Sequence, residues 1–241
     1  MELYKQMAEF YDLLYSYRDY DKEAAFLVSH CSHSRSPAIL DVACGTGSHL
    51  RAIQEKMPRA RLTGLDLNQK MLDQARNKSI DAQFFCANME DFLIRKRFDL
   101  VYSLSSSMQY NLHDADLRKT MQNLAKHTKK GGKIIIDFAF CRERWKEGYT
   151  NVTANSNEHY EVAELYTSHS RDGISLWNPL YLIKDRKTGK VDMTVDKQKI
   201  RIYSLPEINK ILKDLDWDYQ LVRGFSTPQK KNDVPLFVIT C

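Results

Sequence analysis

The chain has 241 residues, of which 43% are hydrophobic and 28% charged, and its net charge is +5. This length fits one domain, or one domain with an insertion, and the composition is ordinary for a globular protein. No apolar run approaches the ~20 residues that span a bilayer. The N-terminus shows no cationic segment followed by an apolar one, so we expect no signal peptide and a cytoplasmic protein.

The cysteines indicate neither a disulfide-bonded protein nor a zinc protein, and the basic residues do not single out one kind of partner. The five cysteines are dispersed without a C-x-x-C pair, which indicates reduced thiols and no disulfide framework or zinc site. His30 and His33 flank Cys31, but this set lacks the usual ligand spacing, so we expect no metal. The basic residues are scattered. A solvated surface explains the positive charge as well as a phosphorylated substrate or RNA does.

Apolar residues at helical spacing predict two helices in residues 3–29, with a break near 17–21. Strands and helices then alternate. The predicted elements are strand 38–43, helix 48–57, strand 61–66, a helix to 78 capped by Asn68, strands 82–87 and 98–103, a helix to 127 capped by Asp114, and strand 133–140. Gly131-Gly132 is expected to end the last of these helices. This alternation predicts a doubly wound, mostly parallel α/β sheet.

The pattern changes after residue 140. Residues 158–170, 173–184 and 190–203 alternate apolar and polar side chains, which predicts an antiparallel β meander. A helix over 205–215, with Pro206 in its first turn, and strands 217–225 and 234–240 follow. We therefore expect a core of residues 1–140 and 204–241, in which residues 1–36 cover a cofactor site. Residues 141–203 form an insertion over the substrate pocket.

The segment Ile39–Gly47 runs from an apolar strand into a glycine turn. Gly45 and Gly47 let a ligand approach the backbone closely, where a Cβ would block it. A dinucleotide fingerprint needs a third glycine, but Leu50 stands at that position. Asp41 beside the turn would repel a pyrophosphate and attract a ligand that carries an ammonium and a sulfonium. This charge pattern favours S-adenosylmethionine over NAD.

The ends of the next two strands add polar groups. Asp66, nineteen residues after Gly47, is placed to accept both hydroxyls of a ribose, although a strand-end Asp also serves as a helix cap. Leu67 could pack on an adenine ring. Asn88 and Met89 suit the amino edge and the face of that ring.

Taken as a set, the motifs D-V-A-C-G-T-G, G-L-D, A-N-M-E-D, F-D-L-V-Y-S and K-K-G-G-K-I-I-I-D resemble the class I S-adenosylmethionine-dependent methyltransferases over residues 38–140. The resemblance implies a seven-stranded sheet with an antiparallel last strand and a cofactor at the carboxyl ends of the strands. The cofactor-binding residues that we expect are Tyr11, Asp41, Ala43, Gly45, Gly47, Asp66, Leu67, Met71, Asn88, Met89 and Ser103.

The kind of methyltransferase follows from what surrounds these motifs. The segment after residue 103 lacks the Asn/Asp-Pro-Pro-Tyr stretch of enzymes that methylate base or glutamine amines, and there is no recognisable RNA-binding appendage. Residues 7–12, 106–110, 148–149 and 234–238 are similar to dideoxysugar N-methyltransferases and related small-molecule enzymes. Those enzymes carry an antiparallel insertion after the fifth strand.

We therefore predict an enzyme that methylates nitrogen or oxygen of a small molecule by in-line displacement. Tyr11 and Tyr110 are candidates to hold the acceptor and face the sulfonium, and His113 is a candidate base. Tyr11 could instead only pack its helix, and an amine acceptor needs no dedicated base. The aromatic residues of 145–181 suit a pocket roof, a meander core or a dimer surface, in a monomer or homodimer. The alternatives are an RNA or protein methyltransferase, favoured by the charge, and a cofactor-binding protein without catalysis.

Overall fold

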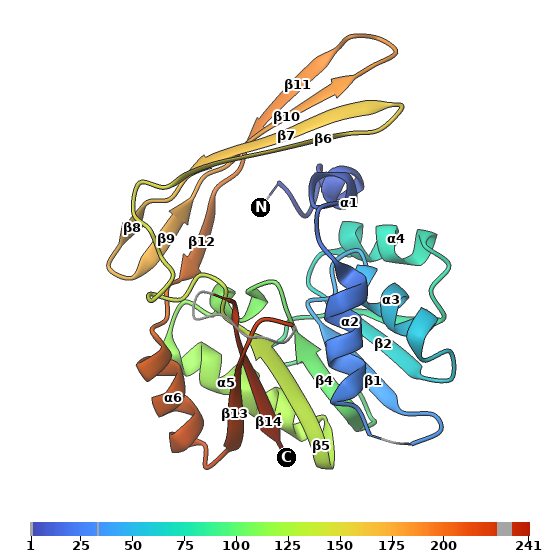
Figure 1. The fold of residues 1–241 in the computed structure, drawn as a ribbon, viewed down its shortest axis with the longest axis vertical. Helices are drawn as coiled ribbons and strands as arrows, with labels where there is room; N and C mark the ends of the chain where they lie inside the picture. The colour runs from blue at the N-terminus through green and yellow to red at the C-terminus, as the bar shows by residue number, and fades with distance from the viewer. Residues whose placement is uncertain (1, 33, 226–232) are drawn as a thin grey trace.

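The computed structural model describes residues 2–32, 34–225 and 233–241. Its centre is a seven-stranded sheet (Figure 1). The strand order is β13 (Asp218–Arg223), β14 (Pro235–Thr240), β5 (Thr128–Asp137), β4 (Phe98–Ser103), β1 (Ala38–Val42), β2 (Arg61–Asp66) and β3 (Ala82–Cys86). β14 lies antiparallel to both neighbours, whereas β5, β4, β1, β2 and β3 are parallel. The predicted mostly parallel sheet with an antiparallel last strand is confirmed.

Helices cover both faces of this sheet. α5 (Asp114–Lys126) and α6 (Leu205–Asp214) pack on one face, where Leu124 and Ile208 are fully buried. α2 (Tyr20–Ser29) and α3 (Ser48–Lys56) pack on the other, where Leu27 and Leu50 are fully buried. The central strand β1 is therefore buried along its whole length, as expected for a parallel strand between two helical layers.

Three predicted helix ends differ from the structure. Asn68 precedes α4 (Gln69–Asn77), but its side chain caps nothing there, because its backbone N–H and its amide both donate to the Asp66 carboxylate. α5 begins at Asp114 itself, after His113. The prediction that Gly131-Gly132 ends this helix is wrong. The helix ends at Lys126, and the glycines lie inside β5, where the pairing with β4 shifts its register.

The N-terminal segment is less helical than its periodicity predicts. Within residues 2–19, the only helical turns are a 3₁₀ turn (Ala8–Phe10) and the short α1 (Tyr11–Leu14). α2 starts where the Asp19 side chain accepts a hydrogen bond from Lys22 N. The apolar residues before α2, including Leu3 and Leu14, are buried against the insertion. Tertiary contacts, rather than helix formation, explain their spacing.

The antiparallel insertion between β5 and α6 is confirmed, but it forms two sheets instead of one meander. The first has the order β11 (Val191–Val195), β10 (Leu180–Asp185), β7 (Tyr160–Thr167) and β6 (Thr150–Ser156). The second has the order β12 (Gln198–Arg201), β9 (Ile174–Trp177) and β8 (Ser170–Arg171). β6 was not predicted from the sequence because its residues, T-N-V-T-A-N-S, are mostly polar. In Figure 1 the first sheet projects over the central sheet, and the N-terminal segment lies between them.

One face of the four-stranded sheet exposes a row of apolar side chains, namely Val152, Leu165, Leu182, Met193 and Val195. Exposed apolar rows of this kind are typical of association surfaces. No helix within the described residues is both long and apolar enough to cross a membrane.

Candidate active site

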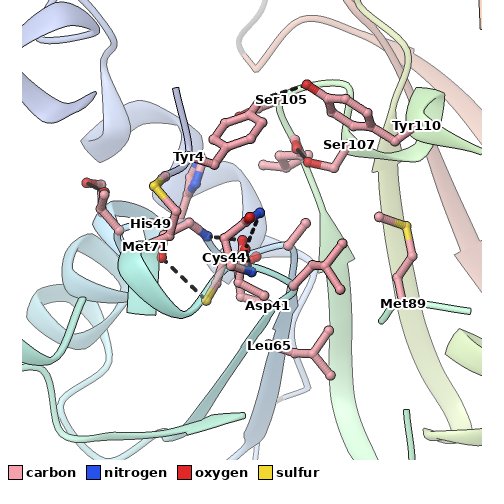
Figure 2. Close-up of a pocket in the computed structure, with 18 of the residues that line it drawn as sticks. Tyr4, Asp41, Cys44, His49, Leu65, Met71, Met89, Ser105, Ser107 and Tyr110 are labelled. Carbon is pink, nitrogen blue, oxygen red and sulfur yellow. Dashed lines mark hydrogen bonds between the residues drawn. The ribbon is translucent and has the colours of Figure 1, made fainter. Parts of the chain in front are cut away.

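A cavity of about 300 Å³ lies at the carboxyl ends of the parallel strands (Figure 2). The segments that follow β1, β2, β3 and β4 all contribute to it, and Tyr4, Tyr11, Arg18 and Tyr20 of the N-terminal segment add to its wall. Ligands of open α/β sheets bind at this edge, because the loops there diverge and leave a crevice. We call this space the first cavity.

The glycine turn after β1 forms the floor of the first cavity. Ala43, Gly45 and Gly47 have positive φ angles of 64°, 55° and 74°. A Cβ on Gly45 would lie 3.3 Å from the Met71 side chain, within the cavity wall. The absence of a side chain at Gly45 therefore lets Met71 approach the turn closely.

Asp66 joins this turn to the end of β2. Its Oδ2 accepts a hydrogen bond from Gly45 N at 2.9 Å, and its Oδ1 accepts one from Asn68 N at 2.8 Å. The side chain lines the first cavity although the residue is only 7% exposed. Oδ2 keeps a further lone pair for an incoming hydroxyl, and the second donor on Oδ1, the Asn68 amide at 3.4 Å, is a long contact that the other hydroxyl of a vicinal diol would replace. Asp66 thus suits the two hydroxyls of a ribose.

Asp41 is almost fully buried, and its Oδ2 accepts a hydrogen bond from the Tyr102 hydroxyl at 2.9 Å. Burial raises the pKa of this carboxyl to about 8, and the nearby Asp66 contributes to the rise. In the free protein the group is therefore mainly neutral at pH 7. The attraction for a cation that the sequence implies develops only when a positive ligand group binds beside it and lowers its pKa again.

Because a bound cation lowers the pKa of Asp41, ligand binding is expected to release a proton that can be measured. We expect S-adenosylmethionine binding near pH 7 to release close to one proton, because the ligand's ammonium stabilises the Asp41 carboxylate. Affinity should rise as the pH increases from 6 towards 8, since less work is then needed to remove the proton. Calorimetric titrations in two buffers of different ionisation enthalpy measure the release.

The Asp41→Asn variant is the matched control, because the amide still accepts the Tyr102 hydrogen bond but cannot ionise. It should bind without the buffer-dependent heat. Equal proton release from both proteins would contradict the assignment to Asp41.

An ion-pair network anchors the N-terminal segment to the glycine turn. Asp12 Oδ1 accepts hydrogen bonds from the hydroxyls of Thr46 (2.6 Å) and Ser48 (3.1 Å). Lys78 Nζ lies 2.6 Å from Asp12 Oδ2 and donates to both hydroxyls. Because α1 is held at this edge, Tyr11 in its first turn stays over the first cavity.

The loop after β4 is held in an unusual conformation. Ser105 and Ser106 both have φ angles of 62°, a region that residues with a Cβ rarely occupy. The buried Asp137 at the end of β5 accepts hydrogen bonds from both backbone N–H groups, at 3.1 and 2.6 Å. Arg18 donates to the Ser105 hydroxyl. The carboxylate therefore fixes a loop that lines the first cavity.

A second cavity, of about 380 Å³, lies between the first cavity and the insertion. Its lining includes Glu164, Tyr166 and Trp177 of the insertion. Both cavities are lined by Tyr4, Tyr11, Arg18, Ser105 and Tyr110. The two spaces therefore share one wall, which comes from the N-terminal segment and the loop after β4.

Hydrogen bonds tie this shared wall to the insertion. The Tyr4 and Tyr110 hydroxyls are 2.8 Å apart, and Figure 2 shows the two rings meeting above the first cavity. Tyr110 also donates to Gln198 Oε1, and Gln198 Nε2 donates to Asp196 at 2.7 Å. Asp196 in turn accepts from Leu3 N at 3.1 Å, so the network closes on the N-terminal segment.

The structure brings most of the predicted site residues together. The first cavity is lined by Tyr11, Asp41, Ala43, Gly45, Asp66, Leu67, Met71, Asn88, Met89 and Tyr110. Gly47, Ser103 and His113 do not line it. Gly47 lies behind the turn, where a Cβ would come within 2.9 Å of Ile80, and Ser103 is fully buried at the end of β4. His113 precedes α5, and its carbonyl accepts a hydrogen bond from Tyr203.

Several residues that line the first cavity were not predicted from the sequence, among them Tyr4, Arg18, Tyr20, Thr46, Ser48, His49, Ser105 and Ser107. Ser48 and His49 directly follow the glycine turn and could have been found from that position. Tyr4, Arg18 and Tyr20 lie more than twenty residues before the turn, in a segment without a motif. Among the residues that the structure describes, no three His, Cys, Asp or Glu side chains gather as a metal site requires.

The bare turn, the strand-end Asp66 and the buried Asp41 fit S-adenosylmethionine, and the sheet order with an antiparallel β14 completes the pattern. Fold and site together define a class I S-adenosylmethionine-dependent methyltransferase.

Comparison with known proteins gives the family. Residues 39–132 match the model of a methyltransferase domain. The chain is 32% identical to dTDP-3-amino-3,4,6-trideoxy-alpha-D-glucopyranose N,N-dimethyltransferase of Streptomyces venezuelae, over 69% of this chain and 70% of that protein. It is 33% identical to dTDP-3-amino-3,6-dideoxy-alpha-D-glucopyranose N,N-dimethyltransferase of Streptomyces fradiae, over 70% of this chain and 66% of that protein. The matched part thus spans about two thirds of these relatives.

A solved structure is similar over nearly the whole chain. The sugar N-methyltransferase KedS8 from Streptoalloteichus has a TM-score of 0.80 and 27% identity, and the match covers 95% of this chain and 92% of KedS8. The chain belongs to the methyltransferase family that contains these dideoxysugar N-methyltransferases. This family favours the predicted small-molecule enzyme over the RNA, protein and non-catalytic alternatives.

Proposed function

We propose that this methyltransferase methylates the amino group of a nucleotide-linked amino sugar. The observation that carries the proposal is the second cavity, which shares a wall with the first and would hold an acceptor beside the methyl donor. Two relatives act, by their names, on dTDP-linked amino sugars. Their identity to this chain and the lining of the second cavity support the same substrate class here.

We assign roles in the first cavity from charge and position. Asp66 would hold the ribose hydroxyls, and Asp41 the ammonium of the methionyl group. Asn88 and Met89, which follow β3, would contact the adenine edge and face. Bound in this way, S-adenosylmethionine supplies a methyl group on a cationic sulfonium, which needs no covalent activation.

The protein's own part in the reaction is then positioning. Tyr11 and Tyr110 stand in the wall shared by the two cavities, where their rings can face the cation and the acceptor together. Residues 141–203 would roof the second cavity. The Tyr110–Gln198 hydrogen bond connects that roof to the loop after β4.

The test uses purified protein, S-adenosylmethionine and two acceptors, dTDP-3-amino-3,6-dideoxyglucose and its hydroxyl counterpart dTDP-6-deoxyglucose. Mass spectrometry should detect one or two added methyl groups on the amino sugar and none on the hydroxyl sugar. Methylation of the hydroxyl sugar alone, or of neither while S-adenosylmethionine binds, would contradict the proposed substrate class.

A further inference from the structure

The second cavity contains a carboxylate whose environment is unusual. Glu164 lies in the middle of β7 and is only 2% exposed. Its neighbours on the same face of the strand are Val162 and Tyr166, and Tyr181 lies directly opposite on β10. An apolar residue would be the ordinary choice on such an inward face, because burying a carboxylate costs several kcal/mol unless it is paired.

The hydrogen bonds of Glu164 leave one oxygen available. The hydroxyls of Tyr15 (3.3 Å) and Tyr181 (3.1 Å) both donate to Oε1. Within residues 2–32, 34–225 and 233–241, Oε2 accepts no hydrogen bond and no Lys, Arg or His forms an ion pair with this carboxylate. Arg18 lines the same cavity, but its guanidinium is already bound to Glu23 at 2.6 Å.

Aromatic rings complete the surroundings. Tyr15, Tyr166 and Trp177 line the second cavity together with Glu164. The rings of Tyr166 and Trp177 meet edge to face, with centroids 5.8 Å apart. A buried carboxylate among aromatic rings is the combination that recognises organic ammonium groups, since the carboxylate neutralises the charge and the ring faces attract it. A neutral hydroxyl could not compensate the carboxylate in this way.

We propose that Glu164, with Tyr15, Tyr166 and Trp177, binds the protonated amino group of the acceptor and selects amines over alcohols. The proposal rests on the proposed function, because it assigns the acceptor end of the same site. Glu164 then also takes the proton that the nitrogen must lose before it can react.

The proton and electron balance is complete with groups already named. The ammonium gives one proton to Glu164 Oε2 and becomes a neutral amine. Its lone pair forms the new bond to the methyl carbon while the carbon–sulfur bond breaks, and that electron pair stays on sulfur. The nitrogen leaves as a methylammonium, and Glu164 returns its proton to water when the product departs. Burial raises the pKa of Glu164, which makes it a better proton acceptor than a solvated carboxylate.

The decisive variant is Glu164→Gln, which keeps an oxygen for the Tyr15 and Tyr181 hydroxyls but removes the charge. We expect kcat/KM for the amino sugar to fall at least about 100-fold, because a buried ion pair with the substrate is lost. S-adenosylmethionine affinity should stay within about threefold. Glu161→Gln is the matched control on the same strand, since the Glu161 side chain is 43% exposed and pairs with Lys184 and Arg186.

A binding experiment tests the ammonium site of Glu164 without the natural substrate. Ligand-observed NMR compares cyclohexylamine with cyclohexanol, which have the same shape but differ in charge. The wild-type protein should bind the amine at least about tenfold more tightly, and Glu164→Gln should remove that preference while cyclohexanol binding is unchanged. Equal losses for both ligands, or an amine preference that survives in the variant, would overturn the proposal.

The two proposals can fail separately. If the wild-type protein methylates no amino sugar but prefers cyclohexylamine through Glu164, the substrate class is wrong and the ammonium subsite stands. If it methylates the amino sugar and Glu164→Gln does so equally well, the proposed function stands and the role of Glu164 is refuted.

Discussion

Replacing Asp66 by Ala should weaken S-adenosylmethionine binding by at least about 100-fold. The carboxylate is expected to accept both ribose hydroxyls, and each hydrogen bond to a charged group contributes about 1.5–3 kcal/mol. The substitution also releases Gly45 N, which Asp66 Oδ2 holds at 2.9 Å, so the glycine turn loses part of its support. Calorimetric titration of wild-type and variant proteins measures the change in Kd.

A second aspartate separates this effect from a general loss of stability. Asp99 lies near the start of β4 and also accepts hydrogen bonds, from Ala38 N at 2.7 Å and from Lys129 at 2.7 Å. It does not line the first cavity. Asp99→Ala should therefore lower the midpoint of urea unfolding but leave the cofactor Kd within about threefold. If Asp66→Ala bound the cofactor as tightly as Asp99→Ala does, the ribose site would lie elsewhere.

The second large effect is expected for Tyr110→Phe. This change removes one hydroxyl and so leaves the Tyr4 hydroxyl and Gln198 Oε1 without their partner. Each buried group left unsatisfied costs about 1–3 kcal/mol. Because the network joins the loop after β4 to the insertion, we expect kcat/KM for the acceptor to fall about 10- to 100-fold. Steady-state kinetics with the amino sugar measures this loss.

Tyr11→Phe is the matched comparison. Tyr11 stands in the same shared wall, but its hydroxyl has no hydrogen-bond partner among the described residues, so only its ring is expected to matter. This variant should keep kcat/KM within about threefold. If Tyr11→Phe lost as much activity as Tyr110→Phe, the hydroxyl of Tyr11 would contact the substrate. The loss of activity in Tyr110→Phe could then not be assigned to the hydrogen bonds that Tyr110 makes with Tyr4 and Gln198.

The parts of the site that could be predicted from sequence are those built by a few consecutive residues. Gly45 needs its positive φ because of the turn it makes, and Asp66 follows from the end of a strand of recognisable pattern. The parts that could not be predicted depend on contacts between distant segments. Asp137 holds the loop of Ser105 and Ser106 from over thirty residues away, and no local pattern marks that pairing.

The same distinction between local and long-range contacts explains the errors in the fold predicted from the sequence. Gly131-Gly132 carries the local signal of a helix end, but its position within β5 depends on pairing with β4 and on the contact between Gly131 N and the Cys241 carbonyl. The polar strand β6 exists because β7 pairs with it along its whole length. In both places long-range hydrogen bonds decide the backbone, and local propensity is too weak to oppose them.

By itself the sequence determined the class of fold, the family and the cofactor, because these depend on short motifs and on periodic burial. Only the tertiary structure decided the cavity that we propose for the acceptor. There the N-terminal segment, the loop after β4 and the insertion meet, and Glu164 becomes a buried carboxylate that forms no ion pair with another described residue. The physical reason is that charge compensation is a property of three-dimensional surroundings. A glutamate in an alternating strand looks like any solvated residue until the segments that cover it are in place.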